Sequence, residues 1–128
     1  MYGATYDWHT LEGPCVIRRQ DRYYCLYSGG RWETESYAVA YAVADSPVGP
    51  WTEPAGAARL LGTVEGRVLG PGHNSVVLGA DGGDVAVYHV WDPMRTARRM
   101  CIDPLVWTDG TPRVLGPSWE PTTLPRTD

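Results

Sequence analysis

The chain repeats its own pattern of strand and turn signals at an offset of about 60 residues. Cys15–Ile17 followed by Asp21 matches Ser75–Val77 followed by Asp81, and further short apolar segments recur at nearly the same offset. A repeat of this length constrains the fold strongly, because each unit must be a supersecondary structure that buries one face against its neighbour. Two such units account for the 128 residues of the chain.

Each unit contains short strands rather than helices. Tyr37–Ala44 alternates large side chains with alanine, and this period of two predicts a strand. Its alanine face presents only methyl groups, so we expect another sheet to stack closely on it. Hairpin turns are predicted at Gln20–Asp21, around Asp81 and at Asp109–Gly110. The 15 glycines, 11 prolines, six Trp and eight Tyr agree with an all-β class.

Three or four strands in meander order per unit are typical of the blades of a β-propeller. The sequence therefore predicts an all-β, partial β-propeller of two four-stranded antiparallel blades, forming a single domain over residues 1–128. We expect blade-like units over about residues 10–66 and 67–128, with residues 1–9 as an extra outer strand. Ring closure usually takes roughly four to eight blades, so we expect two blades to assemble with copies of themselves or to be part of something longer.

The charge pattern argues against nucleic acid as a partner. Arginine supplies all 11 basic side chains, and 15 acidic residues give a net charge of −4, so no basic stripe can follow a phosphate backbone. No apolar run is long enough to span a membrane. The start of the sequence lacks an export signal, and the three cysteines lack metal-ligand spacing, so we expect a cytoplasmic protein.

Polar residues gather at the start of the first strand of each unit. Leu11–Pro14 contains Glu12, and the equivalent segment Gly70–Ser75 contains His73. The innermost strand of each propeller blade lines the central channel, so the starts of these strands should converge at one mouth, where ligands bind. We therefore expect Glu12 and His73 to meet there. Taken singly, each of the two side chains is also typical of an ordinary solvated loop.

Five stretches in order along the chain carry a further signal: Glu12–Gly30, Tyr41–Trp51, Gly70–Val77, Val87–Asp92 and Arg98–Trp107. Together they resemble the C-terminal blades of glycoside hydrolase family 43. Members of that family are five-bladed propellers that hydrolyse α-L-arabinofuranosides or β-D-xylosides with inversion. They use an aspartate base from the first blade, a second aspartate that orients and tunes the acid, and a glutamate acid from a later blade. The resemblance implies an inverting O-glycosyl hydrolase that requires no cofactor.

The resemblance also implies roles for residues at the two strand starts. Glu12, in Glu-Gly-Pro, matches the general acid, which would protonate the departing glycosidic oxygen. His73 and Asn74, in Gly-His-Asn-Ser, match a motif near the channel centre and are expected to contact substrate. In several members the matching histidine approaches a bound calcium or water cluster, so the resemblance makes His73 a candidate metal ligand.

Two further positions are implied to contact the pentose saccharides that this family binds. Arg98 best matches an arginine at the innermost sugar subsite, with Arg99, one residue away, as the alternative. Trp32 follows Ser28–Gly30 and is either a sugar-stacking platform or a cap on the core beside the hairpin.

Part of the family's catalytic set has no counterpart in this sequence. No segment corresponds to the first three blades, which carry the base and the acid-tuning aspartate. Asp7 is a poor substitute, because its segment fits an outer strand better. Inverting hydrolysis needs two carboxyl groups about 6.5–9.5 Å apart. We therefore expect Glu12 alone to leave the chain catalytically silent unless another source supplies the base.

Three hypotheses for function follow. The leading one is a glycoside hydrolase-like propeller portion that acts on or binds arabinofuranosides or xylosides, with the missing blades supplied by another chain. The second is a non-catalytic carbohydrate-binding module that closes a propeller by homo-oligomerisation. The third is a structural subunit that needs a separate N-terminal chain. Sugar binding and the state of assembly discriminate among the three.

Overall fold

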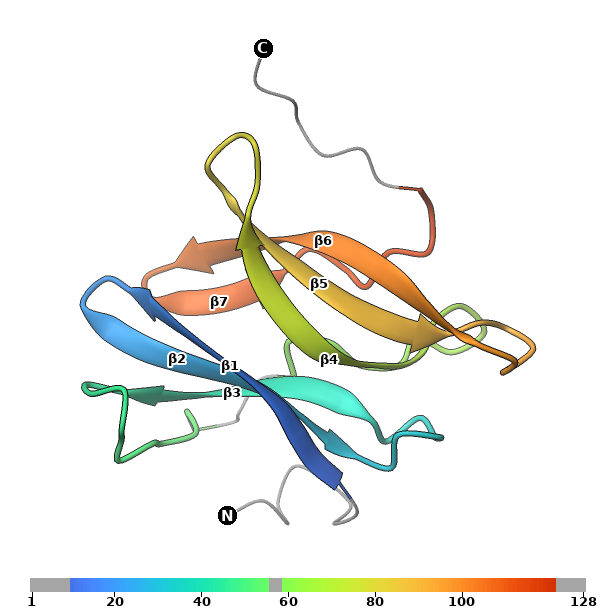
Figure 1. The fold of residues 1–128 in the computed structure, drawn as a ribbon, viewed down its shortest axis with the longest axis horizontal. Helices are drawn as coiled ribbons and strands as arrows, with labels where there is room; N and C mark the ends of the chain where they lie inside the picture. Colours follow the sequence, from blue (N-terminus) through green and yellow to red (C-terminus); the bar gives the residue numbers. More distant parts are fainter. Residues whose placement is uncertain (1–9, 56–58, 122–128) are drawn as a thin grey trace.

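The computed structural model describes residues 10–55 and 59–121, which form seven β-strands in two antiparallel sheets (Figure 1). The first sheet has the strand order β1-β2-β3, and the second has the order β4-β5-β6-β7. Within these residues we find no helix that could cross a membrane. The strands are β1 (Thr10–Arg19), β2 (Arg22–Gly30), β3 (Ala38–Ala44), β4 (Leu69–Leu78), β5 (Asp84–Trp91), β6 (Arg98–Thr108) and β7 (Thr111–Val114).

Tight turns join neighbouring strands at the predicted positions. Between β1 and β2, Gln20 and Asp21 both have positive φ (49° and 60°), as expected of a two-residue turn whose twist matches the flanking strands. Asp109 and Gly110, with φ of 48° and 73°, form the corresponding two-residue turn between β6 and β7. In the loop between β4 and β5, the Asp81 carboxylate accepts a hydrogen bond from the Gly83 N–H at 3.0 Å. The three predicted hairpin turns are therefore confirmed.

The all-β class and the partial propeller are confirmed, but the described part of the first sheet has three strands rather than four. Single-residue bridges lie along the free edge of β3, pairing Val43 with Thr52 and Val39 with Leu61. The chain between these bridges contains Pro54, which cannot donate to a strand ladder. The predicted outer strand over residues 1–9 lies outside the described residues.

The two sheets pack through the face of β3 that carries large side chains. Val39, Tyr41 and Val43 belong to one buried cluster with residues of the second sheet. The alanine face of β3 packs instead against Tyr27 and Trp51 of its own unit. The larger side chains bury more apolar area between the two sheets. Stacking of another sheet on the alanine face stays a prediction. The second sheet contributes Ala86, Tyr88, Val90, Leu105 and Val114.

Polar contacts fasten the two sheets to each other. Arg19, at the end of β1, donates two hydrogen bonds to the buried carboxylate of Asp84 on β5, and Trp107 Nε1 donates to the same carboxylate at 2.8 Å. The Tyr24 hydroxyl donates to the Gly110 carbonyl at 2.8 Å, and its ring lies edge-on to Trp107 at 4.7 Å between centroids. These contacts join positions 65 and 86 residues apart in the chain.

The first strands of the two sheets, β1 and β4, carry bulges at equivalent positions and lie beside each other (Figure 1). The register shifts at residues 12–15 of β1 and at residues 72–75 of β4. Gly13 and His73, 60 positions apart, both have positive φ, of 60° and 51°. A Cβ added to Gly13 would lie 3.2 Å from His73 Cα, so the two bulges touch. A bulge redirects the neighbouring side chains, and the two bulges bring Glu12 and His73 to the same place.

Candidate functional site

Glu12 projects from the β1 bulge toward β4. Its Oε1 accepts a hydrogen bond from the Tyr37 hydroxyl at 2.8 Å, and its Oε2 lies 3.6 Å from His73 Nδ1. The side chains of Glu12 and His73 are 36% and 56% exposed, so a ligand can reach both. The structure thus brings together the two residues that the repeat predicted at one mouth.

Tyr37 connects Glu12 to the buried interior. It immediately precedes β3 and is 0% exposed. Its ring lies over Gly72, where any Cβ would fall inside the van der Waals surface of the ring. Burial raises the pKa of the Tyr37 hydroxyl, and its hydrogen bond to Glu12 raises that pKa further. The Tyr37 hydroxyl therefore stays protonated throughout the neutral range and donates its hydrogen bond to Glu12.

His89, on β5, joins Tyr37 to Arg98. The rings of Tyr37 and His89 stack with centroids 6.2 Å apart and planes 7° apart, and Arg98 Nη1 lies 3.2 Å from His89 Nε2. Because a guanidinium group only donates, Nε2 is the acceptor and the proton of the neutral ring is on Nδ1. Burial lowers the pKa of His89, and the charge of Arg98 lowers it further. We call Glu12, Tyr37, His73, His89 and Arg98 the Glu12 cluster.

Arg98 also lies against two tryptophan rings. Its guanidinium carbon is 5.4 Å from the centroid of Trp32 and 5.7 Å from that of Trp91. The two indoles stack at 6.0 Å, and Trp91 Nε1 donates a hydrogen bond to the Trp32 carbonyl at 2.9 Å. Arg99 instead forms an ion pair with Asp92 at 3.3 Å. Of the two neighbouring arginines, Arg98 is therefore the one that belongs to the Glu12 cluster.

Asn74 lies next to His73 on β4 but faces the interior. It is 3% exposed, and both its amide atoms are buried without a hydrogen-bond partner among the described residues. The backbone N–H of His73 is held by the hydroxyl of buried Ser28 at 2.7 Å. Exposure thus alternates from His73 to Asn74, as expected for successive strand positions. A direct contact between Asn74 and substrate stays a prediction.

The surroundings of His73 give no support to calcium. Residues 10–55 and 59–121 contain no group of three or more His, Cys, Asp or Glu side chains that could hold a metal ion. His73 has the carboxylate of Glu12 beside it at 3.6 Å, whereas calcium takes roughly six to eight oxygen ligands. The three cysteines are free and partly buried.

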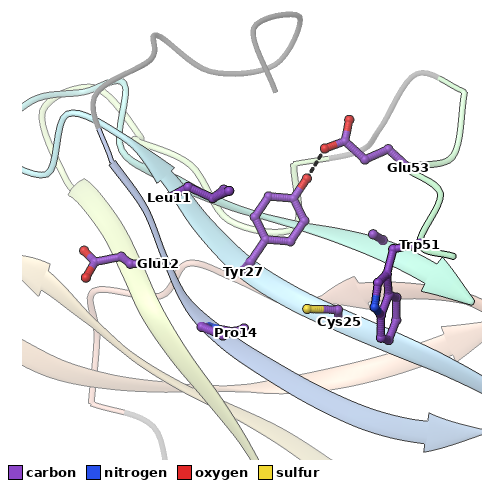
Figure 2. A pocket seen from close by; sticks show the side chains of 8 residues that line it. Leu11, Glu12, Pro14, Cys25, Tyr27, Trp51 and Glu53 are labelled. Atoms are coloured by element: carbon purple, nitrogen blue, oxygen red, sulfur yellow. Dashed lines mark hydrogen bonds between the residues drawn. The ribbon is translucent and has the colours of Figure 1, made fainter. Parts of the chain in front are cut away.

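A separate hollow of about 410 Å³ lies against the other face of the first sheet. Trp51 forms part of its wall, and the Tyr27 hydroxyl donates a hydrogen bond to Glu53 at its rim. Figure 2 shows the Glu12 side chain on the opposite side of the β1 ribbon from Tyr27, Trp51 and Glu53. Glu12 borders the hollow, but its carboxyl group belongs to the Glu12 cluster. The other lining residues are Leu11, Pro14, Cys25 and Ala42.

One chain of contacts, which runs through the Glu12 cluster to the stacked indoles, connects four of the predicted site residues: Glu12, His73, Arg98 and Trp32. Their roles stay predictions. Sequence reasoning missed Tyr37, His89 and Trp91, because aromatic side chains in or beside strands are typical of an ordinary core. One signal was available: Trp91 stands directly opposite Arg98 in the antiparallel register of β5 and β6. Such cross-strand neighbours interact.

Known proteins resemble this chain in sequence. Residues 2–112 match the family model described as glycosyl hydrolases family 43. A curated relative, the beta-D-galactofuranosidase xynD of Aspergillus niger, is 37% identical over 103 residues, which make up 77% of this chain and 29% of that protein. The chain therefore spans less than a third of this relative.

Solved structures resemble it in fold. A thermostable family-43 glycoside hydrolase superposes with a TM-score of 0.84 at 36% identity, covering 92% of this chain and 39% of that one. The α-L-arabinanase of Cellvibrio cellulosa complexed with arabinohexaose gives 0.71 at 27% identity, covering 81% and 36%. An α-L-arabinofuranosidase from Lactobacillus brevis gives 0.71 at 27% identity, covering 88% and 39%. Sequence and fold agree, and this chain belongs to glycosyl hydrolase family 43.

Proposed function

We propose that this chain supplies the general acid of an inverting glycosidase that acts on arabinofuranosides or xylosides, with Glu12 as the acid. The observation that carries the proposal is the placement of the Glu12 carboxyl group. One oxygen is held by the buried Tyr37 hydroxyl, and the other lies beside exposed His73. Family membership supports the same assignment, since family members hydrolyse glycosides.

In this mechanism Glu12 donates its proton to the departing oxygen as the glycosidic bond breaks, while a water molecule attacks from the opposite face of the sugar. The base that activates this water must lie about 6.5–9.5 Å from the acid. The Glu12 cluster holds a single carboxyl group. We therefore assign the base to the portion of the family-43 structures that this chain does not match, and we expect the chain alone to be catalytically silent.

Furanosides are the substrate class that we favour. Three of the relatives are named as a galactofuranosidase, an arabinanase and an arabinofuranosidase, and another is named as an endo-1,4-beta-xylanase. Arg98 suits such a ligand because its guanidinium group offers several donors to sugar hydroxyls. Trp32, in contact with Arg98, offers an apolar ring face on which a sugar ring packs. Arabinofuranosides are therefore our first choice and xylosides the second.

Sugar binding tests this assignment without requiring turnover. Calorimetry or NMR titration with arabino-oligosaccharides and xylo-oligosaccharides would compare the wild type with Arg98→Ala. The matched control is Arg113→Ala, which removes an exposed arginine from β7 of the same sheet. We expect the control to bind like the wild type and Arg98→Ala to bind about tenfold more weakly, through loss of charge-assisted hydrogen bonds. Equal binding by Arg98→Ala, or no binding by the wild type, would contradict the proposal.

Hydrolysis of nitrophenyl arabinofuranoside and nitrophenyl xyloside tests the need for a separate base. The purified chain is compared with Glu12→Gln, which keeps the shape of the side chain but has no proton to deliver. We expect no turnover from either protein. Turnover that disappears in Glu12→Gln would overturn the expected silence. Equal turnover of arabino-oligosaccharides by both proteins would remove Glu12 from the role of acid, because the basic leaving oxygen of these substrates needs a proton.

A non-catalytic carbohydrate-binding module that closes by homo-oligomerisation is the second candidate. The single carboxyl group of the Glu12 cluster favours it, since binding alone needs no base. Light scattering combined with sugar titration separates the two candidates. A small closed oligomer that binds sugar is expected of the module, and a monomer without sugar affinity would exclude it.

A further inference from the structure

Tyr37 is buried, whereas the Glu12 side chain that it contacts is partly exposed. The two residues are 25 positions apart in the chain, and the contact crosses from the loop before β3 to the bulge of β1. A glutamate with an exposed side chain samples several rotamers, because its staggered conformations differ little in free energy in water. A hydrogen bond from a fixed donor can select one of these rotamers. Tyr37 is placed to be that donor.

The Tyr37 ring itself has little freedom to move. Gly72 lies against one side of the ring, and His89 stacks in parallel at 6.2 Å. Ser28, also 0% exposed, interacts with the Tyr37 hydroxyl and accepts the His73 N–H at 2.7 Å. Groups locked by packing in this way hold a functional side chain more accurately than an exposed loop does.

We propose that Tyr37 is a positioning residue that selects the rotamer of Glu12 and makes Oε2 the oxygen that carries the deliverable proton. The inference rests on the proposed role of Glu12 as the acid. A protonated carboxyl group has one O–H donor, and its second oxygen accepts. Because Oε1 accepts from Tyr37 at 2.8 Å, the proton belongs on Oε2, the oxygen beside exposed His73. Tyr37 itself neither gains nor loses a proton in this step.

The test compares Tyr37→Phe with Tyr27→Phe. Tyr27 is a matched control, because its hydroxyl also donates to a glutamate, Glu53, at the hollow on the other face of the first sheet. The readout is the set of three-bond couplings that report the side-chain rotamer of Glu12 in isotope-labelled protein. We expect a single rotamer in the wild type and in Tyr27→Phe, and averaged couplings in Tyr37→Phe. Wild-type couplings for Glu12 in Tyr37→Phe would overturn the proposal.

A second measurement keeps the proposal testable if Tyr37→Phe does not fold. The Tyr37 hydroxyl proton, observed by NMR, is compared between the wild type and Glu12→Ala, which removes a partly exposed side chain from β1. We expect its exchange with water to become faster in Glu12→Ala and to stay slow in Glu12→Gln, which keeps an acceptor oxygen. Equal exchange in wild type and Glu12→Ala would overturn the proposal.

Binding of a cationic iminosugar with pentose configuration tests whether the positioning of Glu12 by Tyr37 affects ligand binding. Its ammonium group pairs with the carboxylate of Glu12, so we expect Tyr37→Phe to weaken its binding about threefold to tenfold and to leave neutral arabinose binding unchanged. Absence of sugar binding together with averaged Glu12 couplings in Tyr37→Phe would contradict the proposed function but support the positioning role. Arg98-dependent sugar binding together with wild-type Glu12 couplings in Tyr37→Phe would support the proposed function and contradict the positioning role.

Discussion

At the scale of single residues, the Glu12 cluster depends on one position that carries no side chain. Gly72 lies beneath the Tyr37 ring, and the hydroxyl of that ring donates a hydrogen bond to the carboxyl group of Glu12. Protein interiors are packed so closely that an added methyl group must displace its neighbours. Gly72 is therefore required for steric reasons, and the first residue that an added methyl group displaces is Tyr37.

Gly72→Ala should lower the free energy of unfolding by about 1–3 kcal/mol through overpacking. It should also let Glu12 exchange among several rotamers, because the displaced Tyr37 loses its hydrogen bond to the Glu12 carboxyl group. Urea unfolding and the NMR couplings of Glu12 measure the two effects. Gly62→Ala is the control, since a Cβ there meets only the flexible side chain of Arg59. A Gly72→Ala protein as stable as this control would contradict the packing argument.

At the scale of the strands, Asp84 on β5 receives hydrogen bonds from Arg19 on β1 and from Trp107 on β6. Burial by itself raises the pKa of Asp84, but the hydrogen bonds from Arg19 and Trp107 outweigh it, and the pKa lies below its usual value of 3.8. The contact therefore stabilises the fold only while the carboxyl group is ionised.

We expect Asp84→Asn to lower the free energy of unfolding by about 1.5 kcal/mol at neutral pH, the low end for a charged hydrogen bond because Arg19 is partly exposed. Since the folded pKa lies below the unfolded one, this contribution is complete above about pH 3.8 and is lost as the pH falls through the folded value. Urea unfolding of both proteins from neutral to acidic pH should show their stabilities converging in acid.

Asp45→Asn provides the matched control for this titration. Asp45 pairs with Arg22 at 3.3 Å, but its side chain is 90% exposed, and exposed ion pairs contribute little to stability. We expect its effect to be within a few tenths of a kcal/mol at every pH. A difference between wild type and Asp84→Asn that stays constant with pH would show that the ionised form of Asp84 is not what stabilises the sheets.

At the scale of the whole molecule, the two sheets share one buried cluster rather than having a core each. Tyr24 and Tyr41 from the first sheet pack in the same cluster as Tyr88 and Leu105 from the second. Neither sheet can therefore expose its inner face without exposing that of the other. Shared burial of this kind is the physical basis of cooperative unfolding in small domains.

We accordingly expect a single unfolding transition in urea, with the same midpoint by tryptophan fluorescence and by far-ultraviolet circular dichroism. Tyr24→Phe removes the hydroxyl that bonds to Gly110 and should shift both midpoints downward together, by about 1 kcal/mol in free energy. Two separate transitions, or a shift seen by one probe alone, would mean that the sheets unfold independently.

Much of the architecture was predictable from local patterns. The alternation over Tyr37–Ala44 predicted β3, and Gln20–Asp21 predicted the first hairpin turn, because strand period and positive φ depend on residues next to each other. The described residues place no second sheet on the alanine face, where Ala42 lines a hollow, so stacking on that face stays a prediction. Periodicity shows that a strand has two different faces, but it does not reveal which one a distant segment covers.

The sequence by itself determined the strands, their turns and the placement of Glu12 and His73 at equivalent positions of two repeated units. Only the tertiary structure decided that buried Tyr37 holds Glu12 and that His89 links Tyr37 to Arg98. The physical reason is that these contacts join separate strands and both sheets through bulges that shift the register. Their partners are set by how the sheets pack, which no local pattern encodes.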